Sequence, residues 1–227
     1  MKLTKTDSSP AARAAHNSIF TIANGYLALN GVMLEDRGDI KPTTIINGVY
    51  DVCNSFMQLP PAKEKRHYLD EEYFEEGGPT PAVANLPSPL LVRVFIDGSE
   101  LCLQRGSISR LRQQLELSNG IYSYSFVHRD AAGRRTRIEQ QRYCDMANVH
   151  CAHLQYRVTP LNYRAELRLI SGIDGTITSN VVGDRQFDVS ACAVPRPGLC
   201  RLDALTRARR IAVSIGVRQR VWCDGRR

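Results

Sequence analysis

Four carboxylates in one short segment come nearest, by type and spacing, to acid–base chemistry. They are Glu71, Glu72, Glu75 and Glu76, in the charge-dense stretch 60–78. A pair of carboxylates can act as general acid and general base only when different surroundings push their pKa values apart. A run of adjacent carboxylates is typical of a solvated helix face, where all of them share one environment. The pattern therefore favours a charged surface excursion over residues 60–82, with one helix or a long loop, rather than a catalytic pair.

Histidine and cysteine are common zinc ligands, and His150, Cys151 and His153 lie close together in the sequence. In the strand predicted at 149–158, residues three apart point to opposite faces, so the two histidines cannot bind one ion without ligands from elsewhere. The seven cysteines form no Cys-x-x-Cys pair, which is typical of reduced, packed thiols. Phosphate-binding loops, nucleophile elbows and His-Glu-x-x-His are absent from the sequence. The patterns predict no catalytic residue, no metal and no cofactor.

Strand patterns dominate residues 91–180, and these strands must position any site that the chain carries. In residues 121–127, tyrosine or phenylalanine alternates with serine, which is the pattern of a half-buried strand. Turns with glycine or proline separate this strand from its neighbours. Further strands are expected at 90–96, 100–103, 134–143, 149–158, 164–173, 187–194 and 211–221. Short strands at this spacing predict an all-β sandwich or barrel.

The N-terminal part divides into a polar segment and a predicted hairpin. Residues 1–15 offer little apolar surface, so we expect them to be flexible. Asn24-Gly25 lies between apolar runs at 18–23 and 26–29, which strongly indicates a hairpin turn. Another strand is expected at 43–51. At this chain length, residues 16–227 are expected to form one domain.

Composition and charge exclude several classes of protein. No apolar run approaches the roughly 18 residues that a membrane helix needs, and the first residues lack the apolar core of a signal peptide. We therefore expect a cytoplasmic protein without a membrane partner. The net charge of +7 comes largely from arginines after Asp184 that have no interleaved aromatic residues. This pattern favours a solvated basic edge, or one covered by a partner, over nucleic-acid binding.

Seven short motifs, in this order, together resemble one family. They lie at residues 22–31, 46–51, 85–87, 95–98, 129–136, 158–162 and 171–175. The series resembles the N-terminal domain of glycoside hydrolase family 65, which includes maltose, trehalose and kojibiose phosphorylases. The resemblance implies a super-β-sandwich of the galactose mutarotase-like type. Two positions depart from the family pattern: Ala23 stands where glycine is usual, and Asn30 stands where arginine is common.

The resemblance also implies an activity and the part of the enzyme that would carry it. In the family, inorganic phosphate as co-substrate, or water in the acid trehalases, attacks an α-linked disaccharide with inversion. The general acid is a glutamate of an (α/α)6 barrel that follows the sandwich, and no segment here matches that barrel. The chain is therefore expected to be a non-catalytic N-terminal domain that is inactive alone. Because it ends just after the last predicted strand, we expect the sandwich to be incomplete at its C-terminus.

Two motif segments are expected at a substrate or barrel interface. They are Asn24, Gly25 and Tyr26, and Asn85, Leu86 and Pro87. Plain turn structure is the alternative for both segments. The expected partner is the missing barrel or a small sugar, with a homodimer open for the full-length family. The alternative function is a stand-alone carbohydrate-binding or protein-interaction β-sandwich module. The disaccharide, and the choice between phosphorolysis and hydrolysis, stay open.

Overall fold

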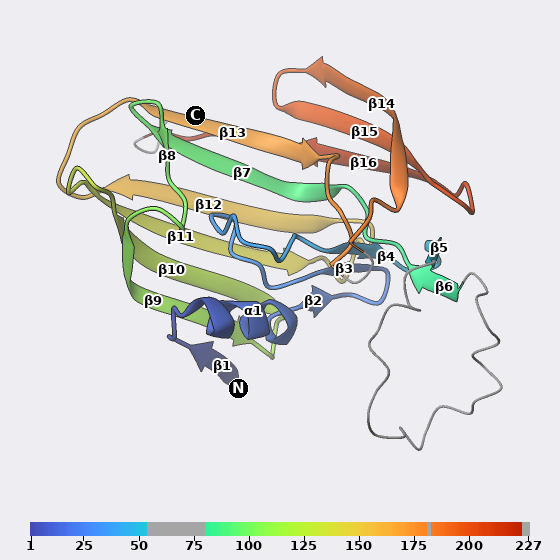
Figure 1. The fold of residues 1–227 in the computed structure, drawn as a ribbon, viewed down its shortest axis with the longest axis horizontal. Helices are drawn as coiled ribbons and strands as arrows, with labels where there is room; N and C mark the ends of the chain where they lie inside the picture. The colour runs from blue at the N-terminus through green and yellow to red at the C-terminus, as the bar shows by residue number, and fades with distance from the viewer. Residues whose placement is uncertain (54–79, 181–182, 224–227) are drawn as a thin grey trace.

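The computed structural model describes residues 1–53, 80–180 and 183–223, and it is built from antiparallel sheets (Figure 1). Most of the excursion predicted at 60–82, with its four carboxylates, lies outside the described residues. The largest sheet has the strand order β1-β9-β10-β11-β12. Its strands are β1 Lys2–Lys5, β9 Ser107–Glu116, β10 Ile121–Arg129, β11 Arg135–Cys144 and β12 Ala152–Pro160.

Three three-stranded sheets and one two-stranded sheet make up the rest of the described strands. Two of the three-stranded sheets have the orders β13-β7-β8 and β14-β15-β16; the third is β2-β3-β4, and the pair is β5-β6. The bounds in the first two are β7 Ser88–Ile96, β8 Ser99–Glu100, β13 Leu167–Asp174, β14 Phe187–Arg196, β15 Leu199–Thr206 and β16 Ala212–Arg218. The remaining elements are α1 Pro10–Ile19, β2 Ile22–Ala23, β3 Leu27–Leu29, β4 Thr44–Ile46, β5 Tyr50–Cys53 and β6 Thr80–Val83. Among the described helices, none is long and apolar enough to span a membrane.

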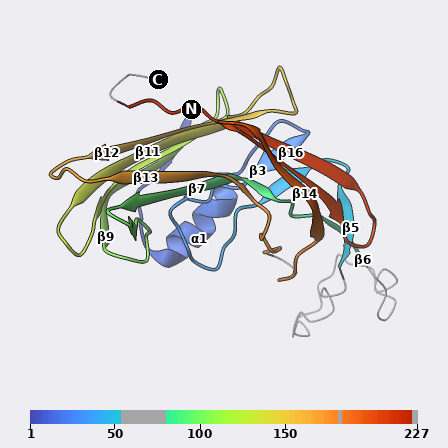
Figure 2. The same ribbon diagram turned by 90° about the horizontal axis from the view of Figure 1, so that it is seen from above.

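The main core lies between the five-stranded sheet and β7. The predicted alternation in β10 is confirmed, since Tyr122, Tyr124 and Phe126 are buried. β7 alternates in the same way and contributes Val94 and Ile96 to the same apolar cluster. Viewed from above, β11 and β12 lie in one layer and β7 and β13 in the next (Figure 2). The prediction of an all-β sandwich is therefore confirmed.

The expected flexibility of residues 1–15 stays a prediction, and the structure places a strand and the start of a helix in this segment. Lys2 to Lys5 form the outermost strand of the large sheet, paired with residues 113–116 of β9. Main-chain hydrogen bonds hold an edge strand, so its side chains need not be apolar. Ser9 then caps α1 by accepting a hydrogen bond from the Ala12 amide, and Pro10 occupies the first helical turn. The helix runs to Ile19, so the strand expected at 18–23 begins only at Ile22.

Other differences concern strands whose pattern was weak. The strand expected at 43–51 is two strands, β4 and β5, separated at Gly48, whose φ is +83°. β9 and β15 were not predicted. In β9, Leu111, Gln113 and Leu115 are all buried, and the polar Gln113 interrupts the alternation of apolar residues from which a strand is predicted. Its amide is satisfied by the His16 ring at 3.0 Å and by the Tyr122 hydroxyl at 2.8 Å, so a polar residue is tolerated inside.

Candidate functional site

Asn24 is the centre of a structural turn between β2 and β3. Its side-chain oxygen accepts hydrogen bonds from the amides of Tyr26 and Leu27 at 3.1 and 2.8 Å. Its side-chain nitrogen donates to the carbonyls of Asp145 and Val149 at 2.7 and 3.0 Å. These bonds tie the β2–β3 hairpin to the loop between β11 and β12. The predicted Asn-Gly hairpin is confirmed, and the polar groups of Asn24 are used within this chain.

The two residues after Asn24 are more accessible. Gly25 is exposed and has a φ of +87°, which side chains other than glycine rarely adopt. Tyr26 is half-buried, and its ring meets the His150 ring edge to face at 4.3 Å between centroids. The expected place of this segment at a substrate or barrel interface stays a prediction. Gly25 and Tyr26 are the two residues of the segment that are accessible for such a contact.

Asn85 joins four segments of the chain from a buried position. Its side-chain oxygen accepts from the Thr44 amide at 3.0 Å, and its side-chain nitrogen donates to the carbonyls of Pro42 and Thr178 at 3.2 and 3.0 Å. Its own amide donates to the Gln186 side chain at 2.8 Å. The asparagine thus holds β4, β6 and the loops before β14 together.

Leu86 and Pro87, which follow Asn85, are also buried. Leu86 packs with Val49, Val213 and Ile215 in a second apolar cluster under β16. The structure therefore gives this segment an internal packing position. Its expected contact with a barrel or a sugar stays a prediction, and such a contact would require these side chains to become accessible.

The histidines near Cys151 have separate neighbours. His153 Nε2 lies 3.1 Å from the Asp145 carboxylate, and the ring of His153 stacks on Tyr143. His150 instead contacts Tyr26. Within the described part of the chain, no group of three or more His, Cys, Asp or Glu side chains could hold a metal ion.

A buried carboxylate lies in the core, at Glu35. The hydroxyls of Tyr124 and Tyr156 both donate to it, Tyr124 at 3.0 Å from Oε2. Burial raises the pKa of the Glu35 carboxyl above its ordinary value, although the two hydrogen bonds act in the opposite direction. A raised pKa is common in general acids, but Glu35 is only 2% exposed and cannot reach a substrate in this structure. Its position fits a structural role.

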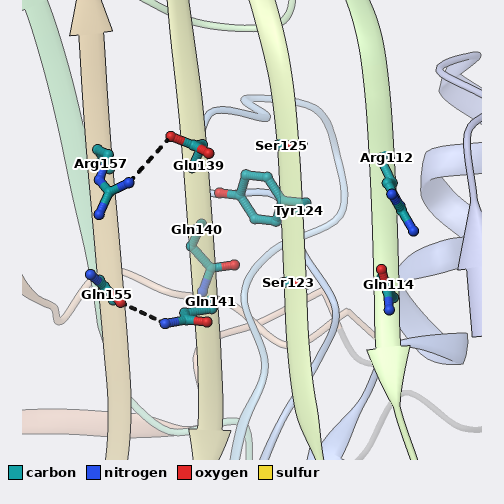
Figure 3. A pocket seen from close by; sticks show the side chains of 10 residues that line it. All are labelled: Arg112, Gln114, Ser123, Tyr124, Ser125, Glu139, Gln140, Gln141, Gln155 and Arg157. Carbon is teal, nitrogen blue, oxygen red and sulfur yellow. Dashed lines mark hydrogen bonds and ion pairs between the residues drawn. The ribbon is translucent and has the colours of Figure 1, made fainter. Parts of the chain in front are cut away.

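The outer face of the large sheet carries a polar trough of about 320 Å³ (Figure 3). Ser123 and Ser125 of β10 form its floor. They are the shortest side chains in two rows that cross four strands, and the register of the sheet defines both rows. One row is Gln114, Ser123, Gln141 and Gln155; the other is Arg112, Ser125, Glu139 and Arg157.

Glu139 and Gln141 of β11 and Gln155 and Arg157 of β12 form one wall of this trough, which we call the far wall, and their side chains pair with one another. The Gln141 amide donates to Gln155, and the Arg157 guanidinium lies 3.8 Å from the Glu139 carboxylate. The near wall, Arg112 and Gln114, comes from β9, which sequence patterns did not reveal as a strand. The alternating serines of β10 can be recognised in the sequence, but the residues that lie beside them on the adjacent strands cannot. The trough offers hydrogen bonds and positive charge, without a nucleophile and base pair.

Named relatives match most of this chain. The kojibiose phosphorylase of Caldanaerobacter subterraneus subsp. tengcongensis is 21% identical over 211 residues, covering 91% of this chain and 24% of that protein. The α,α-trehalose phosphorylase of Thermoanaerobacter brockii is 25% identical over 165 residues, covering 72% of this chain and 20% of that protein. The chain thus spans about a quarter of the length of these relatives.

A solved structure has the same fold. It is a putative kojibiose phosphorylase from the human microbiome, with a TM-score of 0.80 and 18% sequence identity, and the match covers 98% of this chain and 28% of that one. Residues 3–227 match the family model described as "Glycosyl hydrolase family 65, N-terminal domain". Since this match extends over nearly the whole sequence, the chain belongs to glycosyl hydrolase family 65, as an N-terminal domain of that family.

Proposed function

We propose that this chain is the non-catalytic N-terminal domain of an enzyme that cleaves an α-linked glucosyl disaccharide with inversion, using inorganic phosphate as co-substrate. The names of the relatives support this reading, and the chain covers only about a quarter of their length. The catalytic glutamate would lie in a barrel outside this chain. A cytoplasmic location is part of the same proposal.

In the described residues, β12 and β13 are each the last strand of their sheet, and we call these two strands the open edge; their exposed leucines are the observation that carries this proposal. Leu154 of β12 is paired with Arg142, whose side chain is fully buried, and directly opposite residues of an antiparallel pair share a face. Leu154 therefore points to the interior side of the sheet, yet it is 36% exposed. Leu169 of β13 is paired with buried Val94 and is 45% exposed. Exposed leucines on interior faces are expected where a domain packs against another part of a longer protein.

The open edge also argues against a stand-alone module. We expect such a module to bury the apolar side chains on its interior faces, whereas Leu154 and Leu169 are partly exposed. A stand-alone module would be monomeric, and a sugar that binds only its native state would raise its melting temperature. A domain with an uncovered edge would self-associate as its concentration rises. Sedimentation velocity over a range of concentrations separates these two behaviours.

Activity is tested with the chain itself and with a chimera. The purified chain, incubated with phosphate and maltose, trehalose, kojibiose or nigerose, should release no glucose 1-phosphate; release above the blank would overturn the proposal.

In the chimera, this chain replaces the matching N-terminal part of the Caldanaerobacter kojibiose phosphorylase. We expect the chimera to stay folded and to cleave kojibiose, because its catalytic residues come from the retained part. The same enzyme without its N-terminal part is the control and should lose activity.

A further inference from the structure

The polar trough on the outer face of the large sheet has the dimensions of a small-molecule site. Neighbouring strands lie about 4.8 Å apart, so the walls on β9 and β11 are separated by about 10 Å across β10. The two rows are two residues apart along the strands, which is about 7 Å. Ile121 and Val127 precede and follow the serines on the same face of β10.

Several hydrogen-bonding groups in the trough have no protein partner. Within the part of the chain that the structure describes, no hydrogen bond or ion pair involves the side chains of Arg112, Gln114, Ser123 or Ser125. Arg112 and Gln114 lie on β9, on one side of the β10 serines, and Gln141 lies on β11 on the other side, turned toward Gln155 (Figure 3). An ordinary exposed sheet face commonly pairs such long side chains across its strands. Here only the far wall is paired in that way.

The charges of the trough favour an anion. Glu139 is its carboxylate, and that group lies beside the Arg157 guanidinium. Arg112 therefore supplies an unpaired positive charge, in the same row as Ser125. Guanidinium and hydroxyl groups together are suited to phosphate oxygens. The other row contains only amides and a hydroxyl, which both donate and accept, as the hydroxyl groups of a sugar require.

From this arrangement we propose that the trough binds a hydroxylated anion of monosaccharide size, a sugar phosphate, with the phosphate at Arg112 and Ser125 and the sugar hydroxyls at Gln114, Ser123 and Gln141. The site lies on the outer face of the sheet and does not depend on the function proposed above. No bond is made or broken there.

Calorimetric titration of the whole 227-residue chain tests this site, with amide chemical shifts as a second readout. Glucose 1-phosphate, glucose and inorganic phosphate are titrated separately. We expect glucose 1-phosphate to bind more tightly than either of its parts and to shift the amides of β9, β10 and β11. Arg112→Gln should weaken that binding at least about tenfold, because a charge-assisted hydrogen bond is lost. Ser123→Val should also weaken it, since it fills the floor and removes a hydroxyl.

Arg218→Gln is the matched control. Arg218 is exposed on β16, outside this sheet, and the substitution removes the same charge. It should leave binding within twofold of the unchanged chain. The proposal is overturned if the unchanged chain binds none of the three compounds, if Arg112→Gln behaves like Arg218→Gln, or if inorganic phosphate binds as tightly as the ester. Each variant alters a solvent-facing side chain, and thermal unfolding checks that it is folded.

Discussion

The Tyr124 hydroxyl donates a hydrogen bond to the Glu35 carboxylate, 3.0 Å from Oε2, and also accepts one from the Leu34 amide. This pair connects the middle strand of the large sheet to the segment after β3, 89 residues away in the sequence. Tyr156 of β12 reaches the same carboxylate. A single buried acid therefore fixes the position of the 32–37 segment against two strands of the sheet.

Glu35 should make stability depend on pH. Its pKa is raised in the folded protein by burial, so the folded state retains the proton to higher pH than the unfolded chain. Its contribution to stability therefore decreases as pH rises from near 4.5, the ordinary value, through the raised pKa. Glu35→Gln cannot titrate, so relative to the unchanged chain it should gain stability as pH rises from 4 to 8. Urea unfolding of both proteins at several pH values measures this difference; a difference independent of pH would contradict it.

Glu100 should have the opposite pH dependence. Hydrogen bonds from Arg93, at 2.8 and 2.7 Å, and a further pair with Arg37 lower the pKa of Glu100 to about 2. Its contribution is complete above the ordinary value of 4.5 and is lost as pH falls toward 2. Glu100→Gln should cost on the order of 1–2 kcal/mol at pH 7, allowing for solvent screening around the partly exposed arginines. Urea unfolding should show that this cost shrinks toward pH 2.5; an equal cost at both pH values would argue against the ion pair.

Asn24→Ala should destabilise the chain by about 2 kcal/mol, because it leaves the carbonyls of Asp145 and Val149 without their donor. Chemical denaturation monitored by tyrosine fluorescence measures the loss. Asn47→Ala is the control, since Asn47 is exposed in the turn after β4 and no side-chain hydrogen bond is found for it within the described residues. Equal effects of the two variants would show that Asn24 is not the anchor of this turn.

Asn85→Ala should cost at least about 3 kcal/mol, because one substitution leaves an amide and two carbonyls unpaired in a buried place. The loss should appear in the 227-residue chain by itself, without any barrel. Asn180 bonds the Lys41 carbonyl nearby but is exposed, so Asn180→Ala should cost much less. If Asn85→Ala is harmless to the chain, the internal role described for this asparagine is wrong.

The leucines at the open edge should control self-association more than folding. The double variant Leu154→Ser, Leu169→Ser should reduce association in sedimentation velocity and lower stability only slightly, because both side chains are already partly in water. Leu86→Ser, at a fully buried position, should instead cost more than about 3 kcal/mol. Unchanged association in the double variant would remove the main support for the packing edge.

The sequence by itself determined the local features. The tyrosines of β10 point inward and its serines outward because side chains alternate along any strand. The Asn24-Gly25 turn follows from the φ that glycine allows and from the short asparagine side chain that bonds to the adjacent backbone. The motif series indicated the family, which the match over residues 3–227 confirms.

Only the tertiary structure decided which distant segments meet. The side chains of β1 are polar and do not predict a strand, and main-chain bonds pair it with β9, more than 100 residues away. Glu35 is buried, and two tyrosines from different strands donate hydrogen bonds to its carboxylate. The trough needs the neighbours that strand pairing places beside Ser123 and Ser125. Alternation along one strand is a local property, whereas pairing is chosen by backbone hydrogen bonds and packing across the whole fold, which no single segment encodes.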